Sequence, residues 1–501
     1  MDVERPASRW GRVPGEAAVI VQSALAGIVL AFNRVVIYYF ALLNGVYVIL
    51  FLISLFEVVR FVKRTFFSDY EQILRSDMTW PISVIVPAHN EARTIVETIR
   101  SLLNVNYGQF EVIVVNDGST DDTLRRLIET FDLKRTDKIY RRTLPTGPVR
   151  ALYGALEIPN LLVVDKERAG KADALNAGIN VSRYPLYCSV DADSVIEENA
   201  LLRVVKPFME HPEEMVAVGG IVRIVNGCEV REGRVARIGL PRRVLPIFQV
   251  VEYLRAFLSG RIGWSTLRSL LIISGAFGLY RKSEVIAVGG YDRLSETEDL
   301  QLVLKLHESL RRKGRRYRIV FVPDPVCWTE VPATFRVLAR QRNRWHRGLL
   351  QSLWRHRRMI LNPRYGVIGT LALPYFVVFE TLGPFIEILG YVMIALSWFL
   401  GLLNTDFFLL FMIFAVFFGV FLSVAAVLLE EISFRRYPGW EHLAVLVIVA
   451  VLENFGYRQI LSLFKVKAFW DFLLRRGAWG RMDREGFRPA PPPDVGRVRD
   501  S

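Results

Sequence analysis

Apolar residues gather in long blocks at both ends of the chain, and a more polar middle separates the blocks. An apolar run at 17–32 stops at Asn33-Arg34, and a longer run follows at 35–59. A transmembrane helix needs about 20 apolar residues, so the longer run is sufficient to cross a bilayer. The shorter run either crosses as well or lies in the interface. Three further candidate spans lie at 367–403, 407–428 and 442–464.

Two of these C-terminal candidate spans contain residues that interrupt a membrane helix. The first is long enough for one kinked or two short crossings, and Pro374 and Pro384 can kink or break it. The last is expected to be only partly inserted because it contains Glu453, Asn454 and Arg458.

The polar middle alternates between strand and helix patterns. Residues 81–87 form a β-branched apolar run between prolines, which is typical of a buried strand, and a helix-like stretch follows at Glu91–Leu103. Further strands are predicted at 110–115, 161–164 and 186–190. This alternation predicts a parallel sheet with crossover helices, and ligands bind at the carboxyl ends of strands in such sheets. Asp117 and Asp191 both fall at strand ends and are expected in one crevice.

Two arginine-containing segments accompany these elements. Residues 242–272 and 348–362 mix apolar side chains with arginines. They are interpreted either as amphipathic helices against the membrane or as ordinary surface helices, and the sequence favours neither.

The excess of positive charge narrows the range of partners. Lys and Arg number 64 against 50 Asp and Glu, a net charge of +14. Such an excess fits either a nucleic-acid-binding module or a membrane protein with basic flanks and an anionic substrate. Basic residues abut the apolar blocks, as at Arg60 and Lys63, so the membrane interpretation is favoured and no nucleic-acid partner is expected. The three cysteines are too few and too scattered for a disulfide framework or a zinc site.

Carboxylates follow the predicted strands. Asn116-Asp117-Gly118-Ser119 is a turn after a strand, and on its own it is better explained as a loop in which Ser119 or Thr120 caps a helix. Asp191-Ala192-Asp193 is more specific, because two carboxylates at i and i+2 on a bending chain can face one hard cation. The alternative is a capping pair for a helix beginning near Glu197, which leaves the preceding Gly170-Lys171 turn unexplained. A lysine in a turn ahead of a helix suits an anionic phosphate.

Two later motifs have both a structural and a chemical interpretation. Thr297-Glu298-Asp299 caps a predicted helix at Leu300–Leu310, and a carboxylate there can also take a proton from an acceptor hydroxyl. Gln341-x-x-Arg344-Trp345 is one face of a basic amphipathic helix, and its arginine suits phosphate while its indole suits a sugar ring.

The ordered set of motifs resembles that of the membrane-embedded, processive family 2 glycosyltransferases, which include cellulose, hyaluronan and poly-N-acetylglucosamine synthases. The resemblance covers roughly residues 35–485. It implies an α/β GT-A-like domain, with a Rossmann-like, mixed but mostly parallel sheet, combined with an α-helical transmembrane region. It also implies a divalent cation, Mg²⁺ or Mn²⁺, as cofactor.

The resemblance assigns donor-side roles to individual residues. It implies that Asp117 contacts the uracil of a UDP-sugar and that the turn with Ala88 and Glu91 flanks the base. The resemblance also implies that Asp191 contacts the nucleotide and that Asp193 is the metal ligand. The remaining nucleotide-sugar contacts that the resemblance implies are Lys171, Gln341 and Arg344.

Acceptor-side roles follow in the same way. The resemblance implies that Asp299 is the catalytic base and that Glu298 and Trp345 contact the acceptor sugar. Ser274-Gly275 stands at the place of the acceptor-side loop, and it looks more like the hyaluronan and poly-N-acetylglucosamine synthases than the cellulose synthases. A plain glycine turn explains Ser274-Gly275 equally well.

The sequence therefore predicts a membrane-bound, inverting and processive transferase that elongates a β-linked polysaccharide from UDP-GlcNAc or UDP-glucose and translocates it. Its expected partners are the donor, the growing polysaccharide, the lipid bilayer and accessory secretion subunits. The alternatives are a non-processive transferase that adds one sugar to a lipid carrier and a sugar-binding subunit without catalysis. Retention of Asp193 and Asp299 disfavours the latter.

The expected location is the cell membrane, the inner or plasma membrane, as a multi-pass protein with a cytoplasmic catalytic domain. The predicted division of the chain is an N-terminal segment 1–34, a transmembrane helix 35–64, a catalytic domain 65–347, an interface helix with C-terminal transmembrane helices 348–464, and a basic tail 465–501.

Overall fold

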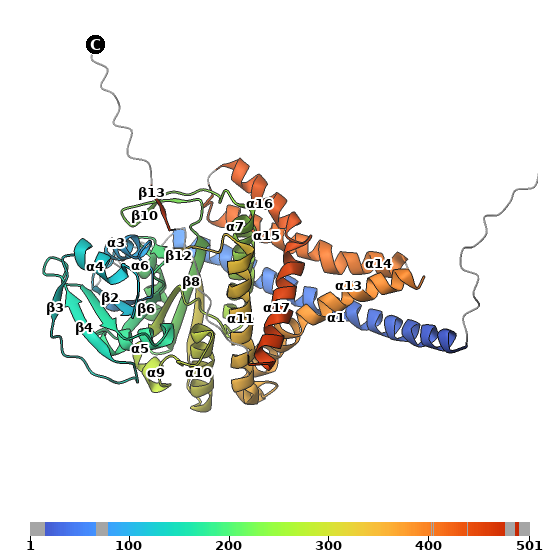
Figure 1. Ribbon diagram of the computed structural model, residues 1–501, viewed down its shortest axis with the longest axis horizontal. Helices are drawn as coiled ribbons and strands as arrows, with labels where there is room; N and C mark the ends of the chain where they lie inside the picture. The colour runs from blue at the N-terminus through green and yellow to red at the C-terminus, as the bar shows by residue number, and fades with distance from the viewer. Residues whose placement is uncertain are drawn as a thin grey trace, which may run out of the picture.

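The computed structural model describes residues 16–66, 79–401, 403, 405–437, 439–475 and 486–489. The first fifteen residues of the predicted segment 1–34 and most of the predicted tail beyond Arg475 lie outside this part. Figure 1 shows a sheet-containing domain at one end of the long axis and extended helices at the other. Two helices, α11 (Phe335–Arg355) and α17 (Tyr457–Leu473), pack side by side between them.

A mixed sheet of ten strands forms the centre of the domain, in the order β3-β4-β5-β2-β1-β6-β11-β8-β12-β7. The strands are β1 (Ile82–Ala88), β2 (Phe110–Asp117), β3 (Lys134–Thr136), β4 (Val149–Gly154), β5 (Leu161–Lys166), β6 (Leu186–Val190), β7 (Ser194–Ile196), β8 (Met215–Ile224), β11 (Phe277–Arg281) and β12 (Arg318–Thr329). The neighbours β5, β2, β1 and β6 are parallel, and β8 and β12 run the same way. Only β4, β11 and β7 of this sheet run in the opposite direction, so the predicted strands and their mostly parallel arrangement are confirmed.

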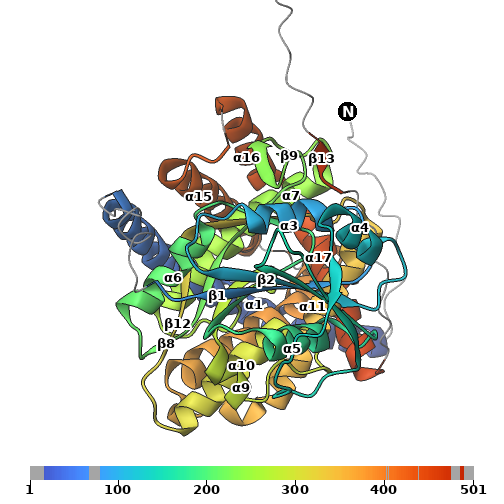
Figure 2. The ribbon, with the colours of Figure 1, turned by 90° about the vertical axis from the view of Figure 1, so that its left-hand side faces the viewer.

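Helices cover both faces of the parallel strands (Figure 2). On one face lie α3 (Ile95–Leu103) and α4 (Thr123–Thr130), and on the other lies α5 (Lys171–Val181). The buried residues Ile95, Ile99 and Leu102 recur at helical spacing on α3, which is why this face packs on the sheet. A Cβ atom at Gly178 would lie 2.3 Å from Cγ2 of Ile85, so α5 approaches β1 as closely as a glycine permits.

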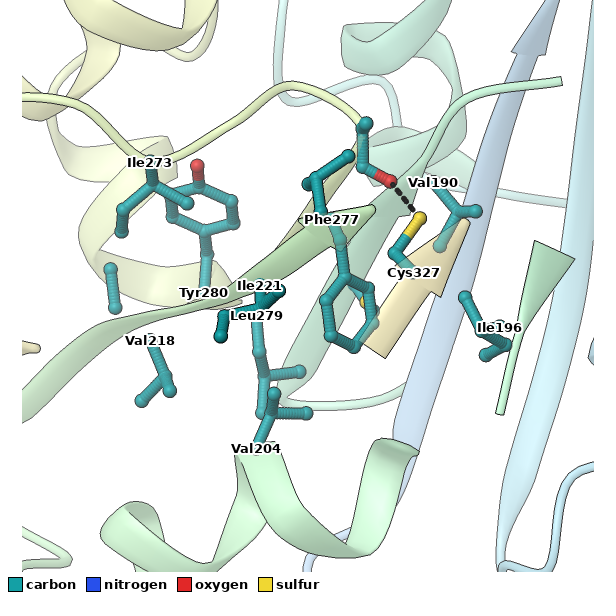
Figure 3. Packing of buried hydrophobic residues seen from close by; sticks show 14 of the residues in the cluster. Val190, Ile196, Val204, Val218, Ile221, Ile273, Phe277, Leu279, Tyr280 and Cys327 are labelled. Carbon is teal, nitrogen blue, oxygen red and sulfur yellow. Dashed lines mark hydrogen bonds between the residues drawn. The ribbon is translucent and has the colours of Figure 1, made fainter. Parts of the chain in front are cut away.

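The remaining elements of the domain extend this core. They are α6 (Ala200–Glu210), α9 (Lys282–Ala287), α10 (Glu298–Arg312) and a small sheet of β9 (Glu229–Arg231), β10 (Arg234–Arg237) and β13 (Arg488–Pro489). Figure 3 shows how the core closes around β11, where Phe277, Leu279 and Tyr280 pack beside β6, β8 and β12. Cys327 donates from Sγ to the carbonyl oxygen of Ala276 at 3.5 Å. All three cysteines are buried and free, as the sequence predicts for small apolar side chains.

The two arginine-containing segments are helical. Residues 242–272 contain α7 (Val244–Leu254), η1 (Arg255–Arg261) and α8 (Ile262–Thr266). The segment 348–362 contains the end of α11 and the short turn η2 (Arg357–Met359). Because α1 (Glu16–Phe66) packs against η1 and α8, the sheet domain and the N-terminal helix form one packed body.

Two helices within the described residues are long and apolar enough to cross a membrane, or up to four if each bent pair is one span. The first lies in α1, at Ser23–Lys63, and the second is Thr405–Ser433, built from α14 (Thr405–Met412), η6 (Ile413–Phe417) and α15 (Phe418–Ser433). One bent pair, Ile368–Thr381 and Gly383–Phe399, turns by 41°. This pair comprises η4 (Ile368–Ala372), α12 (Leu373–Tyr375), η5 (Phe376–Thr381) and α13 (Gly383–Phe399), and η3 (Pro363–Tyr365) precedes it.

The bends test the interruptions predicted in the C-terminal block. The first pair breaks next to Pro384, whereas Pro374 lies inside its first member without breaking it. The second pair, α16 (Trp440–Leu452) and α17, turns by 55° across the segment that holds Glu453 and Asn454. The kink predicted near Pro384 is therefore confirmed, whereas the partial insertion predicted for the last candidate span stays a prediction.

Three expectations from the sequence need correction. The helix α1 is continuous for 51 residues, so the division at 34/35 is no break; neither Asn33 nor Arg34 is a helix breaker, and Asn33 donates to Ser397 Oγ at 3.3 Å. The tail does not begin at Lys465, because α17 continues to Leu473. Strand β7 rather than a helix follows Asp193, so the capping alternative for that motif is wrong.

Replacing Gly178 by Ala should destabilise the domain by about 1–3 kcal/mol, because the new methyl group has no room beside Ile85. Thermal unfolding of the purified protein, followed by intrinsic fluorescence, measures the effect. Gly108→Ala is the control, because a Cβ atom there meets nothing within 4 Å. Equal stability of the two variants would contradict the close packing of α5 on β1.

Candidate active site

The predicted donor residues lie on neighbouring strands at one edge of the sheet. Ala88 ends β1, Asp117 ends β2 and Asp191 follows β6, and these three strands are adjacent in the order β2-β1-β6. Since the strands are parallel, their carboxyl ends meet at the same edge. Asp117 and Asp191 therefore lie at the same edge of the sheet, and the common crevice expected for them stays a prediction.

Hydrogen bonds join the first two turns into one wall. His89 Nδ1 lies 2.9 Å from the carbonyl oxygen of Asp117, and the amide of Glu91 donates to Thr123 Oγ1 at 2.9 Å. Asn90 adopts a positive φ of 59° and accepts from the amide of Thr120 at 2.8 Å. The helix cap expected at Ser119 or Thr120 is wrong, because α4 begins after Asp122.

Asp117 is buried, and the structure shows it holding the loop that precedes Lys171. Its carboxylate accepts from Lys166 Nζ at 2.6 Å, from the Ala169 amide at 2.9 Å and from the Gly170 amide at 2.7 Å. Asp117 and Lys166 are register partners on the parallel strands β2 and β5, which places the two charges side by side. The expected contact of Asp117 with a nucleotide base stays a prediction.

The same ion-pair network continues to the loop before α10. Lys166 Nζ also lies 2.8 Å from Asp173 Oδ1, and both side chains are fully buried. Arg293 Nε lies 2.9 Å from Asp173 Oδ2, and the amide of Gly147 donates to the same carboxylate. A buried lysine is tolerated only with such partners. Sequence reasoning missed this network. The one sign of it in the sequence is a lysine at the end of an apolar strand.

Lys171 is the centre of the charged cluster. It opens α5, and its Nζ lies 2.6 Å from Asp191 Oδ1 and 3.1 Å from Glu298 Oε1. Burial on its own would lower the pKa of Lys171, but the charges of Asp191 and Glu298 outweigh it and raise the pKa. The ammonium therefore stays charged next to the position expected for a diphosphate.

Asp299 stands beside this cluster at the start of α10, where Thr297 precedes the helix as predicted. The amide of Gly275 donates to Asp299 Oδ2 at 3.0 Å, and the amide of Leu300 donates to Oδ1 at 2.8 Å. A Cβ atom at Gly275 would lie 2.9 Å from Lys171 Nζ, so a larger residue would push into the cluster. The predicted acceptor-side loop Ser274-Gly275 thus contacts the predicted base.

The two adjacent carboxylates differ in acidity. Burial, and next the charge of Glu298, raise the pKa of Asp299 above its ordinary value. Burial acts in the same direction on Glu298, but Lys171 and Arg344 overcome it and lower the pKa of Glu298. Neighbouring acids with opposite shifts suit different roles, and a raised pKa suits a general base.

Asp193 lies behind Asp191 and is nearly buried. Its Oδ1 accepts from Thr329 Oγ1 at 3.3 Å and from Ser194 Oγ at 3.4 Å, because β7 and β12 pair directly after it. The described residues contain no group of three or more His, Cys, Asp or Glu side chains arranged for a metal. Two carboxylates nevertheless fit Mg²⁺ or Mn²⁺, since such ions also take phosphate oxygens and water.

The residues of the basic-aromatic tag lie on α11. Gln341 is buried and its Oε1 has no hydrogen-bond partner among the described residues. The guanidinium of Arg342 lies 4.5 Å from the centroid of the Trp345 ring and pairs with Glu252 at 2.7 Å. Arg344 acts on the site through its charge, which lowers the pKa of Glu298.

Gly348 brings α11 against the start of α10. Gln341, Arg344, Trp345 and Gly348 follow the i, i+3, i+4, i+7 spacing of one helix face. A Cβ atom at Gly348 would lie 2.4 Å from Cγ2 of Thr297. The glycine therefore permits the contact that joins the tag to the Thr297-Glu298-Asp299 turn, and the sequence interpretation missed it.

Arg261, on η1, is a second site residue that the sequence interpretation missed. Burial lowers its pKa to about 10, so it stays charged at neutral pH, and its charge lowers the pKa of Asp299. Its guanidinium stacks 3.9 Å from the centroid of the Phe257 ring, and its Nη1 has no hydrogen-bond partner among the described residues. In the sequence, only the arginine-rich pattern of residues 242–272 pointed to Arg261.

Comparison with known families identifies this arrangement. The profile of glycosyl transferase family 2 matches residues 83–282, and that of glycosyl transferase family group 2 matches residues 188–429. The chain carries glycosyl transferase family 2 domains. The two matches together include every predicted site residue, from Ala88 to Trp345.

Several curated relatives of the chain are polysaccharide synthases by name. A poly-beta-1,6-N-acetyl-D-glucosamine synthase of Staphylococcus aureus is 32% identical over 270 residues, which are 53% of this chain and 54% of the relative. That of Staphylococcus epidermidis is 30% identical over 278 residues, 54% and 56% of the two chains. The chain thus spans about half the length of the curated relatives it matches.

A solved structure supports the fold. A mannosyltransferase from Pyrobaculum calidifontis, determined with GDP-Man and Mn²⁺, has a TM-score of 0.52 and 18% identity, and the match covers 90% of this chain and 100% of that one. The expected GT-A-like fold class is therefore confirmed.

The raised pKa of Asp299 gives a testable prediction for the pH dependence of sugar transfer. A base must be deprotonated, so kcat/KM should fall as the pH drops through the raised pKa of Asp299. Glu298→Gln removes a negative charge and should move this acid limb to lower pH. Arg261→Gln removes a positive charge and should move it to higher pH.

The measurement is kcat/KM for sugar transfer as a function of pH. The quantity compared is the pH at which the acid limb falls, and not the maximum value of kcat/KM. The two variants serve as controls for each other, since both replace a charged side chain with an amide. A shift of the limb in the same direction in both variants would show that another group titrates.

Proposed function

We propose that the protein is a membrane-bound, inverting glycosyltransferase that elongates a β-linked polysaccharide from a UDP-sugar and passes the product across the membrane. The observation that carries this proposal is the position of Asp299. Its carboxylate, held by two backbone amides, lies beside Lys171 and Glu298 and next to the helix α11 that packs on the apolar helices.

The chemistry needs one base and a stabilised leaving group. The acceptor hydroxyl oxygen attacks C1 of the donor sugar, and the bond from C1 to the diphosphate oxygen breaks. The hydroxyl proton passes to Asp299, and the electron pair leaves with UDP. Lys171, Gln341 and Arg344 provide the cationic and amide groups for the diphosphate.

Asp191 and Asp193 would hold Mg²⁺ or Mn²⁺ together with diphosphate oxygens. The bound ion would neutralise charge on the leaving group. Glu298 and Trp345 would contact the acceptor: Glu298 adjoins the base, and the indole of Trp345 offers a broad apolar face.

The names of the relatives support UDP-GlcNAc ahead of UDP-glucose, since the matched synthases make a polymer of N-acetylglucosamine. Two to four apolar helices support a multi-pass location in the cell membrane with the sheet domain on the cytoplasmic side. The lipid bilayer and accessory secretion subunits are the proposed partners.

Asp299→Asn should reduce kcat by about 100- to 10,000-fold, because the amide cannot accept the proton. UDP release is measured for purified protein with UDP-GlcNAc, UDP-glucose or UDP-glucuronate, and Mg²⁺ or Mn²⁺. Asp132→Asn is the matched control, because that carboxylate is exposed just after the end of α4. Unchanged turnover in Asp299→Asn would overturn the assignment of the base.

The length of the product distinguishes the polymerase from its rival. Gel analysis of the radiolabelled product should show a polymer. A single-sugar lipid would instead identify a non-processive transferase and remove the proposed translocation.

A further inference from the structure

A second, strongly basic cavity lies apart from the charged cluster around Lys171. Its volume is about 910 Å³, and its walls come from α1, α8, the C-terminal end of α10, the start of β12 and η3. The arginines that line it are Arg268, Arg311, Arg315, Arg316, Arg318 and Arg364. Among the described residues, only two carboxylates line it, Glu57 and Glu214. None of these residues has a role in the proposed transfer reaction.

Part of this positive charge is not neutralised within the described residues. Arg315 pairs with Glu284 at 2.6 Å, and Arg318 pairs with Glu214 at 2.8 Å. No carboxylate of the described part lies within salt-bridge distance of Arg311, Arg316 or Arg364. The Nε atom of Arg311 is also buried without a hydrogen-bond partner among the described residues, although the guanidinium lies 5.5 Å from the centroid of the Tyr317 ring.

The charge of the cavity is carried by guanidinium groups. His307 lines the wall, but its two ring nitrogens lie 2.7 Å from Tyr317 Oη and 2.8 Å from the carbonyl oxygen of Leu270. Burial lowers the pKa of His307 to about 4, so the ring is neutral near pH 7. Arginine forks match the oxygens of a phosphate group better than any other protein side chain does.

The cavity opens beside the segments that enter the apolar region. Glu57 belongs to the candidate span Ser23–Lys63, and Arg364 stands four residues before the bent pair that begins at Ile368. Exposed apolar side chains flank both positions in the sequence: Phe56 and Val59 on α1, and Leu361 and Val367 around η3. A phosphate bound by the arginines would therefore have an apolar surface next to it.

We propose that this cavity binds the phosphate group of an anionic ligand, with the phospholipid headgroup as the source that the flanking apolar residues favour. The ligand would also restrain α10, because that helix begins with Glu298 and Asp299 and reaches the cavity near its end with Arg311. Binding is independent of the proposed sugar transfer and is measured without it.

The test compares the full chain in nanodiscs of phosphatidylcholine with and without phosphatidylglycerol. Phosphatidylglycerol should raise the Tm of the wild type by about 5 °C, as a ligand specific for the folded state does. The double variant Arg316→Gln/Arg364→Gln should lose most of this rise. Both side chains are exposed, so their replacement leaves the core intact.

Arg357→Gln/Arg358→Gln is the matched control. It removes the same charge from the turn η2, shortly before Arg364, but neither residue lines the cavity. The control should keep the full rise in Tm. An equal loss in both double variants would mean general attraction to an anionic surface and would overturn the proposal. If Arg316→Gln/Arg364→Gln does not fold, Arg316→Gln alone takes its place.

Adding inorganic phosphate to phosphatidylcholine discs distinguishes the two sources. A rise with phosphatidylglycerol alone, lost in the cavity variant, assigns the site to a lipid headgroup. A rise with inorganic phosphate that the cavity variant also loses assigns it to a soluble phosphate ligand. A rise with either anion that is the same in the wild type and the cavity variant would overturn the site.

Discussion

The ammonium group of Lys171 holds together carboxylates that would otherwise repel one another. Asp191 comes from the end of β6 and Glu298 from the start of α10, so the two approach each other only across a shared cation. The amide of Gly275 fixes Asp299 in the same place, and the missing side chain at that glycine leaves room for Lys171. Without the ammonium, the donor side and the base side of the site would have no direct link at this point.

A second lysine holds two other carboxylates together in the same way. Lys166 is buried between Asp117 and Asp173, and Arg293 joins Asp173 from the loop that leads to α10. Removing one partner of such a buried set costs about 3–5 kcal/mol, because a charge is then left without compensation. The shape of the turn that carries Lys171 thus depends on a buried network of charges.

The sequence predicts most of the site because its residues stand at strand ends and helix starts, which local patterns reveal. Asp117, Asp191 and Asp299 were found in this way, as were the strands that carry them. The Lys166–Asp173 pair was missed because it depends on the register of β2 and β5. Arg261 and Gly348 were missed because their importance comes from contacts with residues far away in the chain. The apolar pattern likewise did not show that α1 passes through Asn33 without a break.

The contact between Gly348 and Thr297 has a mechanical consequence. If α11 moved by one residue along its helical path, Arg347 or Leu349 would take the position of Gly348 against Thr297. A side chain does not fit there. The helix therefore has one permitted position relative to α10, and Asn343 ties it on another side to Asp471 of α17 at 2.7 Å. Trp345 is then part of a fixed frame, and in the proposed reaction a saccharide that advances by one unit would slide over a stationary indole.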